Sequence, residues 1–183
     1  MEISDIDLAR AAAGGDAQAF HALVDRHSAE MFRLALSLCG KRADAEDICQ
    51  EAFFGAFRGV HRFDGRSSFK TWLTRILLRQ ASKTWKKNKA RNATSLDLVD
   101  EAGARSRNAS PTSPVGSVDA SLDILEVIQR LGPEHQQVVV LRELQGMSYD
   151  QIAQTLGIPR GTVESRLFRA RIELRKLLKD YEP

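Results

Sequence analysis

The segment that follows Pro159 carries seven basic side chains and only two acidic ones as far as residue 179. The basic residues are Arg160, Arg166, Arg169, Arg171, Arg175, Lys176 and Lys179. Guanidinium groups bind phosphate oxygens and the acceptor edge of guanine. The chemistry that this segment could perform is therefore recognition of a polyanion, and of duplex DNA if a rigid helix presents the side chains.

Two predicted helices and a tight turn would position these cations. Ser148 can accept from the free N–H groups that start the first helix, and Gly157 can end it in a left-handed conformation. Pro159 then favours the first turn of a second helix. That helix has an apolar stripe with spacings of 4, 3, 4 and 3: Val163, Leu167, Ala170, Leu174 and Leu177.

This layout predicts a helix-turn-helix whose second helix enters the DNA major groove. An ordinary amphipathic helix pair with a solvated basic face is the alternative. The agreement of turn, caps and charge favours the DNA-binding interpretation.

The net charge of +3 conceals a strong segregation of charge along the 183 residues. Residues 1–57 hold 5 basic and 10 acidic side chains, whereas residues 58–91 hold 11 basic and 1 acidic. Residues 92–128 hold 2 and 6, and residues 129–183 hold 9 and 7. Two basic zones separated by acidic ones predict two contacts with polyanions, and the acidic start predicts a different, basic partner.

The composition also excludes several classes of protein. No run approaches the ~18 apolar residues that span a bilayer, and the acidic first residues do not resemble a signal peptide. We therefore expect a cytoplasmic protein without membrane insertion. Cys39 and Cys49 form no C-x-x-C pair and the four histidines are scattered, which predicts no metal site and no cofactor. The sequence has no Walker loop and no nucleophile elbow, so it predicts no enzyme and no catalytic residue.

Helical periodicity covers almost the whole chain and strand-like alternation is absent, so the predicted fold class is all-α. We expect two small helical modules, residues 1–91 and residues 119–183. The predicted helices start after the caps Ser4 and Asp16 and then cover about residues 45–58, 69–87, 119–131 and 134–144, ahead of the helix-turn-helix. Asp44 and Asp47 resemble a capping box for the third helix. Residues 92–118 are rich in Asn, Ser, Pro and Gly, which predicts a flexible linker.

A second basic surface is predicted on the helix that starts near residue 69. A stripe separate from its apolar side, with Lys83 alongside, carries Arg75, Arg79, Ser82 and Lys86. Such a stripe can follow a phosphate backbone. The loop before it adds groups that suit unstacked single-stranded bases: His61, Arg62, Phe63, Arg66 and Phe69. Phe63, Phe69 and Trp72 fit a core better than a base platform, and for Trp85 both interpretations stay open.

Three stretches that follow in order together resemble a known family. They are DAEDICQEAFFGAF (residues 44–57), FKTWLTRI (69–76) and LRELQGMSYDQIAQTLGIPRGTVESRLFRAR (141–171). In this order and spacing the chain resembles bacterial RNA polymerase sigma factors of the small extracytoplasmic-function (ECF) group of the sigma-70 family. The resemblance covers about residues 8–90 and 119–178, and three ordered motifs are more specific than one helix-turn-helix.

The resemblance implies that residues 1–91 are sigma region 2, which binds the β′ clamp helices of core RNA polymerase and opens the promoter −10 element. Its core-binding side chains would be Asp47, Gln50, Glu51 and Phe54. Its contacts with the −10 strand would be His61, Arg62, Phe63, Arg66, Arg75, Arg79, Lys83 and Lys86.

Residues 119–183 would be sigma region 4, which reads the −35 element as duplex DNA and touches the β flap. Its DNA contacts would be Arg160, Thr162, Glu164, Ser165, Arg166, Phe168 and Arg169. The linker would run toward the RNA exit path, and an anti-sigma factor would be a further partner.

The sequence departs from the family pattern at two positions that bear on DNA. Arg79 stands where an asparagine often helps to read the −10 strand, and Glu164 stands where a basic residue is frequent. A carboxylate at that position can accept from cytosine N4 or repel phosphate. The rival function is a stand-alone helix-turn-helix regulator that binds duplex DNA by itself, normally as a dimer. It would leave the basic helix and the acidic motif at residues 44–57 unexplained.

Overall fold

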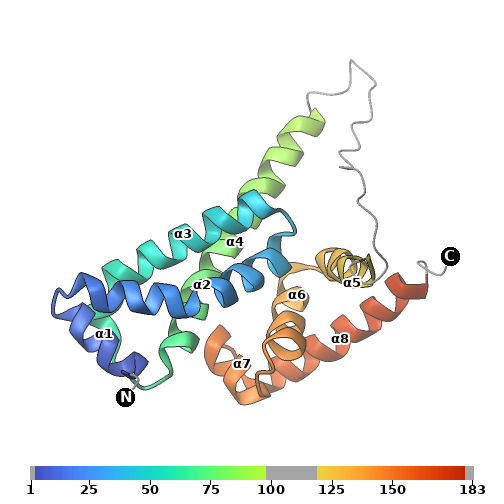
Figure 1. Ribbon diagram of the computed structural model, residues 1–183. Helices are drawn as coiled ribbons and strands as arrows, with labels where there is room; N and C mark the ends of the chain where they lie inside the picture. Colours follow the sequence, from blue (N-terminus) through green and yellow to red (C-terminus); the bar gives the residue numbers. More distant parts are fainter. Residues whose placement is uncertain (1–2, 98–118, 180–183) are drawn as a thin grey trace.

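The computed structural model of the chain describes residues 3–97 and 119–179, with side chains for residues 3–88 and 124–179. These residues form helices and contain no strand, which confirms the predicted all-α fold. The elements in chain order are α1 (Asp5–Ala13), α2 (Ala17–Cys39), α3 (Arg42–Gly59), the 3₁₀ turn η1 (Val60–Arg62), α4 (Phe69–Asp97), α5 (Asp119–Gln129), α6 (Pro133–Val139), the π-helical turn η2 (Val140–Leu144), α7 (Tyr149–Leu156) and α8 (Arg160–Lys179). Helices α1–α4 form one group and α5–α8 a second group beside it (Figure 1).

The first two helices begin and end where the sequence predicts. The hydroxyl of Ser4 accepts from the backbone N–H of Asp7, and the carboxylate of Asp16 accepts from two N–H groups in the first turn of α2. α2 ends at Gly40, whose φ of 73° lies in the left-handed region that glycine adopts without a Cβ penalty.

The starts and ends of α3 and α4 differ from the prediction. α3 begins at Arg42 without a side-chain cap, so the expected capping box is wrong, and Asp44 instead accepts a hydrogen bond from Asn88 Nδ2 at 3.3 Å. α4 continues to Asp97, across the expected module boundary at residue 91. Residues 88–97 contain neither Gly nor Pro, so nothing in that stretch stops a helix. The rest of the expected linker, residues 98–118, lies outside the described residues.

The core of the first group sets the direction in which α4 presents its charged side. Met31 of α2, Ile48 of α3, and Leu73 and Leu77 of α4 are at most 1% exposed. Because side chains three and four residues apart share a helix face, fixing Leu73 and Leu77 inward turns the basic stripe of α4 away from this core.

The second group packs the helix-turn-helix against α6. Val138, Leu141, Ile152 and Leu167 are at most 1% exposed and bring α6, η2, α7 and α8 together. Pro133 occupies the start of α6, where its missing N–H has no helical partner to lose. The helix predicted at residues 134–144 is α-helical only to Val139 and widens into a π-helical turn at η2.

The two groups pack directly against each other. The side-chain amide of Gln136 is buried between them and donates to the carbonyls of Ser37 at 3.2 Å and Leu38 at 3.0 Å, at the end of α2. Nearby, Gln137 Nε2 donates to Ser82 Oγ on α4 at 3.0 Å. The buried apolar residues of both groups form one continuous cluster. The polar anchors therefore hold α6 against α2 and α4 at the edge of a shared core.

Candidate nucleic-acid and protein interfaces

The helix-turn-helix is built as its caps predict. Ser148 Oγ accepts from the backbone N–H of Gln151, whose side chain accepts in return from the N–H of Ser148 at 2.8 Å, so the pair forms a full capping box. Gly157 ends α7 in the left-handed region, with a φ of 67°. Val163 and Leu167 of α8 are buried in the core of the second helix group, so the opposite side of α8 faces solvent.

Three of the predicted duplex contacts lie on that outward side of α8. Ser165 and Arg169 are exposed, and the ring of Phe168 is 67% exposed. An aromatic ring this exposed in the middle of a helix gains nothing from the core of its own chain. Thr162 is half-buried at the first turn, where its carbonyl accepts from Ser165 Oγ. The four residues form a continuous strip beginning near the start of α8, the part of a recognition helix that enters the groove.

Arg166 lies elsewhere than the sequence suggested. Its guanidinium reaches back to α6 and makes an ion pair with Glu134 at 2.8 Å, with the Arg166 side chain only 22% exposed. The pair joins α6 to α8 on the inner flank of the helix-turn-helix. On the other flank, Arg171 donates to Glu143 at 3.1 Å. In this conformation Arg166 stabilises the arrangement of the helices and is turned away from the outward strip.

Arg160 is held by two carboxylates. Its Nε donates to Glu164 Oε1 at 3.0 Å, one turn along α8, and its Nη1 lies 3.2 and 3.3 Å from the two oxygens of Asp150 on α7. The hydrogen bond to Glu164, with the nearby charge of Asp150, raises the pKa of Arg160 above its ordinary value. The ion pair therefore links the first turns of α7 and α8.

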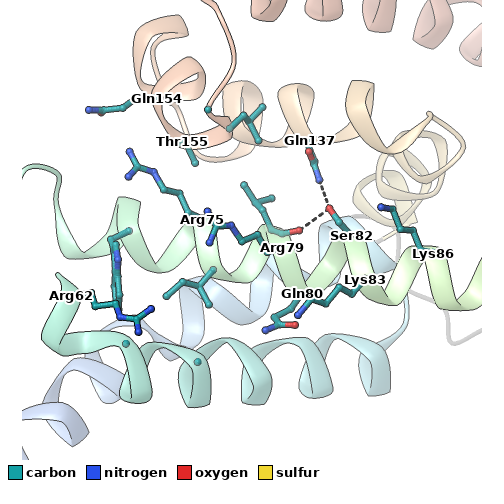
Figure 2. Close-up of a pocket in the computed structure, with 17 residues that line it drawn as sticks. Arg62, Arg75, Arg79, Gln80, Ser82, Lys83, Lys86, Gln137, Gln154 and Thr155 are labelled. Atoms are coloured by element: carbon teal, nitrogen blue, oxygen red, sulfur yellow. Dashed lines mark hydrogen bonds between the residues drawn. The ribbon is translucent and has the colours of Figure 1, made fainter.

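A cleft of about 860 Å³ separates α4 from α6 and α7 and collects most of the predicted strand-binding cations. Its basic lining residues are Arg62, Arg75, Arg79, Lys83 and Lys86, and no acidic residue lines it. Figure 2 shows Arg75 extending from α4 toward Thr155. Arg75 Nε is buried and makes no hydrogen bond within the described residues. A cleft lined by one sign of charge attracts the opposite sign, so it suits a polyanion.

The remaining predicted strand contacts lie outside this cleft. His61 is exposed on η1, and Arg66 pairs with Asp64 at 3.3 Å in the exposed loop before α4. Phe63 packs in an aromatic cluster, with its ring centre 5.6 Å from that of the buried Phe69 and 5.5 Å from that of Trp72. The core interpretation of these three rings is confirmed for Phe69, whereas Trp72 also lines the cleft. Trp85 is 39% exposed on α4.

The second wall of the cleft is a feature that sequence periodicity did not predict. It is uncharged and mostly polar, and it consists of Gln137, Gln154 and Thr155 with Leu156 and the turn at Gly157. These residues come from α6 and α7, far from α4 in sequence. Only the packing of the two groups brings them opposite Arg75 and Arg79.

The predicted core-binding residues share one exposed face of α3. Asp47, Gln50, Glu51 and Phe54 follow one another at spacings of 3, 1 and 3, and all four are exposed. Phe54 is 56% exposed, with the guanidinium of Arg58 5.6 Å from its ring centre. The three polar residues also line a hollow of about 450 Å³ between α3 and α4. An acidic face that carries an exposed aromatic ring suits a basic protein partner.

The chain matches known families over most of its length. Residues 23–91 match the family described as Sigma-70 region 2, and residues 121–174 match Sigma-70, region 4. The ECF RNA polymerase sigma-E factor of Haemophilus influenzae is 33% identical over 177 residues, which cover 93% of each chain. The chain belongs to the ECF RNA polymerase sigma factors. The ECF RNA polymerase sigma factor SigW of Bacillus subtilis is 31% identical over 172 residues, with 91% of this chain and 92% of SigW covered.

Solved structures resemble this sigma factor over both helix groups. CnrH, in complex with the cytosolic domain of CnrY, superposes with a TM-score of 0.69 at 27% identity and covers 98% of this chain and 99% of its own. The sigma factor RpoE of Bartonella quintana, in complex with the anti-sigma factor NepR, has a TM-score of 0.66 at 26% identity, with 89% and 98% covered. Family membership supports sigma-factor function over a stand-alone helix-turn-helix regulator.

Both cysteines of this sigma factor have thiols whose pKa is raised. Burial, together with the nearby Cys39, raises the pKa of Cys49 to about 11, and burial also raises the pKa of Cys39. Among the described residues, no group of His, Cys, Asp and Glu could hold a metal ion. None of the described helices combines the length and the apolar character that a bilayer crossing requires.

Proposed function

We propose that this sigma factor binds core RNA polymerase in the cytoplasm and directs it to promoters, with residues 1–91 acting as region 2 and residues 119–183 as region 4. The observation that carries the proposal is the presence on one chain of two different surfaces that suit DNA. One is the outward side of α8, which a duplex groove can accept, and the other is the charged cleft at α4. The protein contributes binding and no catalytic residue, metal or cofactor of its own.

Recognition of the −35 element falls to α8. Ser165, Phe168 and Arg169 are exposed side by side, so they can reach base edges when the helix lies in the major groove. Thr162 lies beside them, and the neighbouring cations contribute attraction to phosphate, which is independent of sequence.

Capture of the opened −10 strand falls to the cleft and the loop before α4. Arg75, Arg79, Lys83 and Lys86 offer charge to consecutive phosphates, and the unpaired Nε of Arg75 gains a partner when one binds. Arg62 joins them from η1, while His61, Phe63 and Arg66 extend the surface along the loop. Holding unstacked bases offsets the cost of opening the duplex, which is a few kcal/mol per base.

The acidic face of α3 docks on core polymerase, at the β′ clamp helices, and region 4 touches the β flap. Two structural relatives support protein partners, because each was solved in a complex. CnrH is bound to the cytosolic domain of CnrY, and the sigma factor RpoE is bound to the anti-sigma factor NepR. An anti-sigma factor is accordingly proposed as a partner of this chain.

Run-off transcription with purified core enzyme on a library of promoter sequences tests the proposal. We expect the wild-type chain to start RNA synthesis on a subset of templates that share an upstream and a downstream element. The matched variant is Glu51→Lys, which reverses a charge on the exposed face of α3 without touching the core. It should lower retention of core enzyme in a pull-down while the circular-dichroism spectrum stays that of the wild type. If the variant retains as much core enzyme as the wild type does, the exposed face of α3 is not the surface that binds core polymerase.

A further inference from the structure

Glu164 is an acidic residue near the start of α8, beside the predicted DNA contacts. It lies one turn after the start of α8, directly before Ser165 and one turn before Phe168, and its side chain is 49% exposed. It is thus a carboxylate at the edge of the outward strip that the proposed function assigns to DNA. Phosphate oxygens repel a carboxylate, so contact with the backbone of DNA does not explain it.

The structure holds this carboxylate in one orientation. Arg160 Nε bonds Glu164 Oε1 at 3.0 Å, and the same guanidinium is fixed on its other side by Asp150, with Nη1–O distances of 3.2 and 3.3 Å. Within the described residues, Arg160 is the only side chain that forms a hydrogen bond or ion pair with Glu164. One carboxylate oxygen of Glu164 is therefore engaged, and the other remains available to a donor outside the chain.

The chemistry of that oxygen limits what it can read. An ionised carboxylate only accepts hydrogen bonds. In the major groove, guanine offers two acceptors, and thymine offers an acceptor and a methyl group, so both oppose it. Adenine places an acceptor, N7, beside its N6 donor, whereas cytosine offers the N4 amino group as a donor. Cytosine is the base that satisfies the oxygen best.

We propose that Glu164 selects cytosine at one step of the upstream promoter element and that Arg160 acts as the positioning residue that aims it. The inference rests on the proposed function, because it requires that α8 lie in the major groove. It also reassigns Arg160, whose guanidinium is occupied by two carboxylates, from a contact with DNA to a support for one.

The test uses holoenzyme and a promoter that the wild-type chain transcribes, with each upstream position changed in turn to all four bases. We expect the wild type to prefer cytosine at one step by about five- to 150-fold in run-off rate. Glu164→Gln should move the preference at that step toward adenine, and Glu164→Arg toward guanine, because these side chains match those bases. The preferences at all other steps should stay unchanged.

An identical base profile for the three proteins at every step overturns the inference, because Glu164 would then serve only the ion pair. Failure of the wild-type chain to start RNA synthesis on any template instead overturns the proposed function, and the inference falls with it. The two failures are therefore distinguishable in one experiment.

Arg160 is tested by its effect on base preference. Arg160→Ala should weaken the cytosine preference and leave the other steps as they are, while Arg160→Lys, which keeps a cation beside Glu164, should retain more of it. The matched control is Arg171→Ala, which removes another exposed cation of α8, paired with Glu143 of η2, without touching Glu164. If Arg160→Ala leaves the cytosine preference intact, or changes it no more than Arg171→Ala does, Arg160 has no positioning role.

Discussion

At the scale of single residues, one polar cluster ties α1 to α2. The carboxylate of Asp5 lies 2.8 Å from His27 Nε2, and its other oxygen accepts from Arg26 at 2.5 Å. His27 is buried, and its ring centre lies 5.6 Å from that of Phe69. Burial alone would raise the pKa of Asp5, but the hydrogen bonds from Arg26 and His27 and their charges lower it below its ordinary value of 3.8. The ionised carboxylate therefore stabilises the folded chain.

Asp5→Asn should lower the free energy of unfolding at neutral pH by about 1 kcal/mol. This is the contribution of a hydrogen bond to a charged group, reduced because solvent partly screens the pair. Because the folded pKa of Asp5 is lowered, its contribution is fully present above 3.8 and is lost as the pH falls through the folded value. Urea titrations of wild type and variant at several pH values would measure this. The control is Asp25→Asn, whose exposed partner is His21, and a stability gap that persists at low pH would contradict the cause given.

Arg169 is the exposed cation of the outward strip of α8. Arg169→Ala should cost about 1–3 kcal/mol of recognition at one upstream base step if the side chain contacts guanine in a bidentate manner. Run-off rates on promoters substituted at single positions would show it, with Arg175→Ala, an exposed cation further along the helix, as control. An equal loss on every promoter would mean that Arg169 binds only phosphate.

At the scale of elements, the caps explain which boundaries the sequence predicts. Ser4, Asp16 and Ser148 each bond N–H groups of the helix that follows, and all three starts agree with the structure. A cap is a local device, so a sequence window contains all its atoms. α3 starts instead at Arg42 with no side-chain cap, and Asp44 bonds Asn88 on α4. That contact joins residues 44 positions apart, which no local pattern contains.

Ser148→Ala should destabilise the helix-turn-helix by about 1 kcal/mol, because it removes the acceptor from the capping box that starts α7. Thermal unfolding followed by circular dichroism would measure the loss. Ser148→Asp keeps a good cap and should retain most of the stability. Equal unfolding temperatures for wild type and Ser148→Ala would show that packing of Ile152 alone holds the start of α7.

At the scale of the whole molecule, the two helix groups share one apolar core, and a few polar anchors hold its edge. The sequence predicts both groups, because each has its own apolar periodicity. It does not predict that they pack together, because the residue that anchors them, Gln136, is polar and has no place in an apolar stripe. Its two hydrogen bonds use carbonyls at the end of α2 that have no helical partner, and only folding brings these carbonyls to Gln136. The polar wall of the cleft escaped prediction for the same reason.

Gln136→Leu should loosen the packing of the two groups by about 1–3 kcal/mol, because it leaves the carbonyls of Ser37 and Leu38 without their buried donor. Small-angle scattering of the free chain should then report a larger radius of gyration. Gln154→Leu is the control, since Gln154 lines the cleft and is exposed. A radius equal to that of the wild type in both variants would show that apolar contacts alone hold the groups together.

The continuous apolar cluster shared by the two groups has a thermodynamic consequence. Melting one group would uncover buried side chains of the other, such as Leu38 of α2 or Val139 of α6. The two groups should therefore unfold together, at one midpoint temperature. Two separate family models match the chain, but scanning calorimetry of the free chain should show a single peak. The calorimetric enthalpy of unfolding should equal the van't Hoff enthalpy.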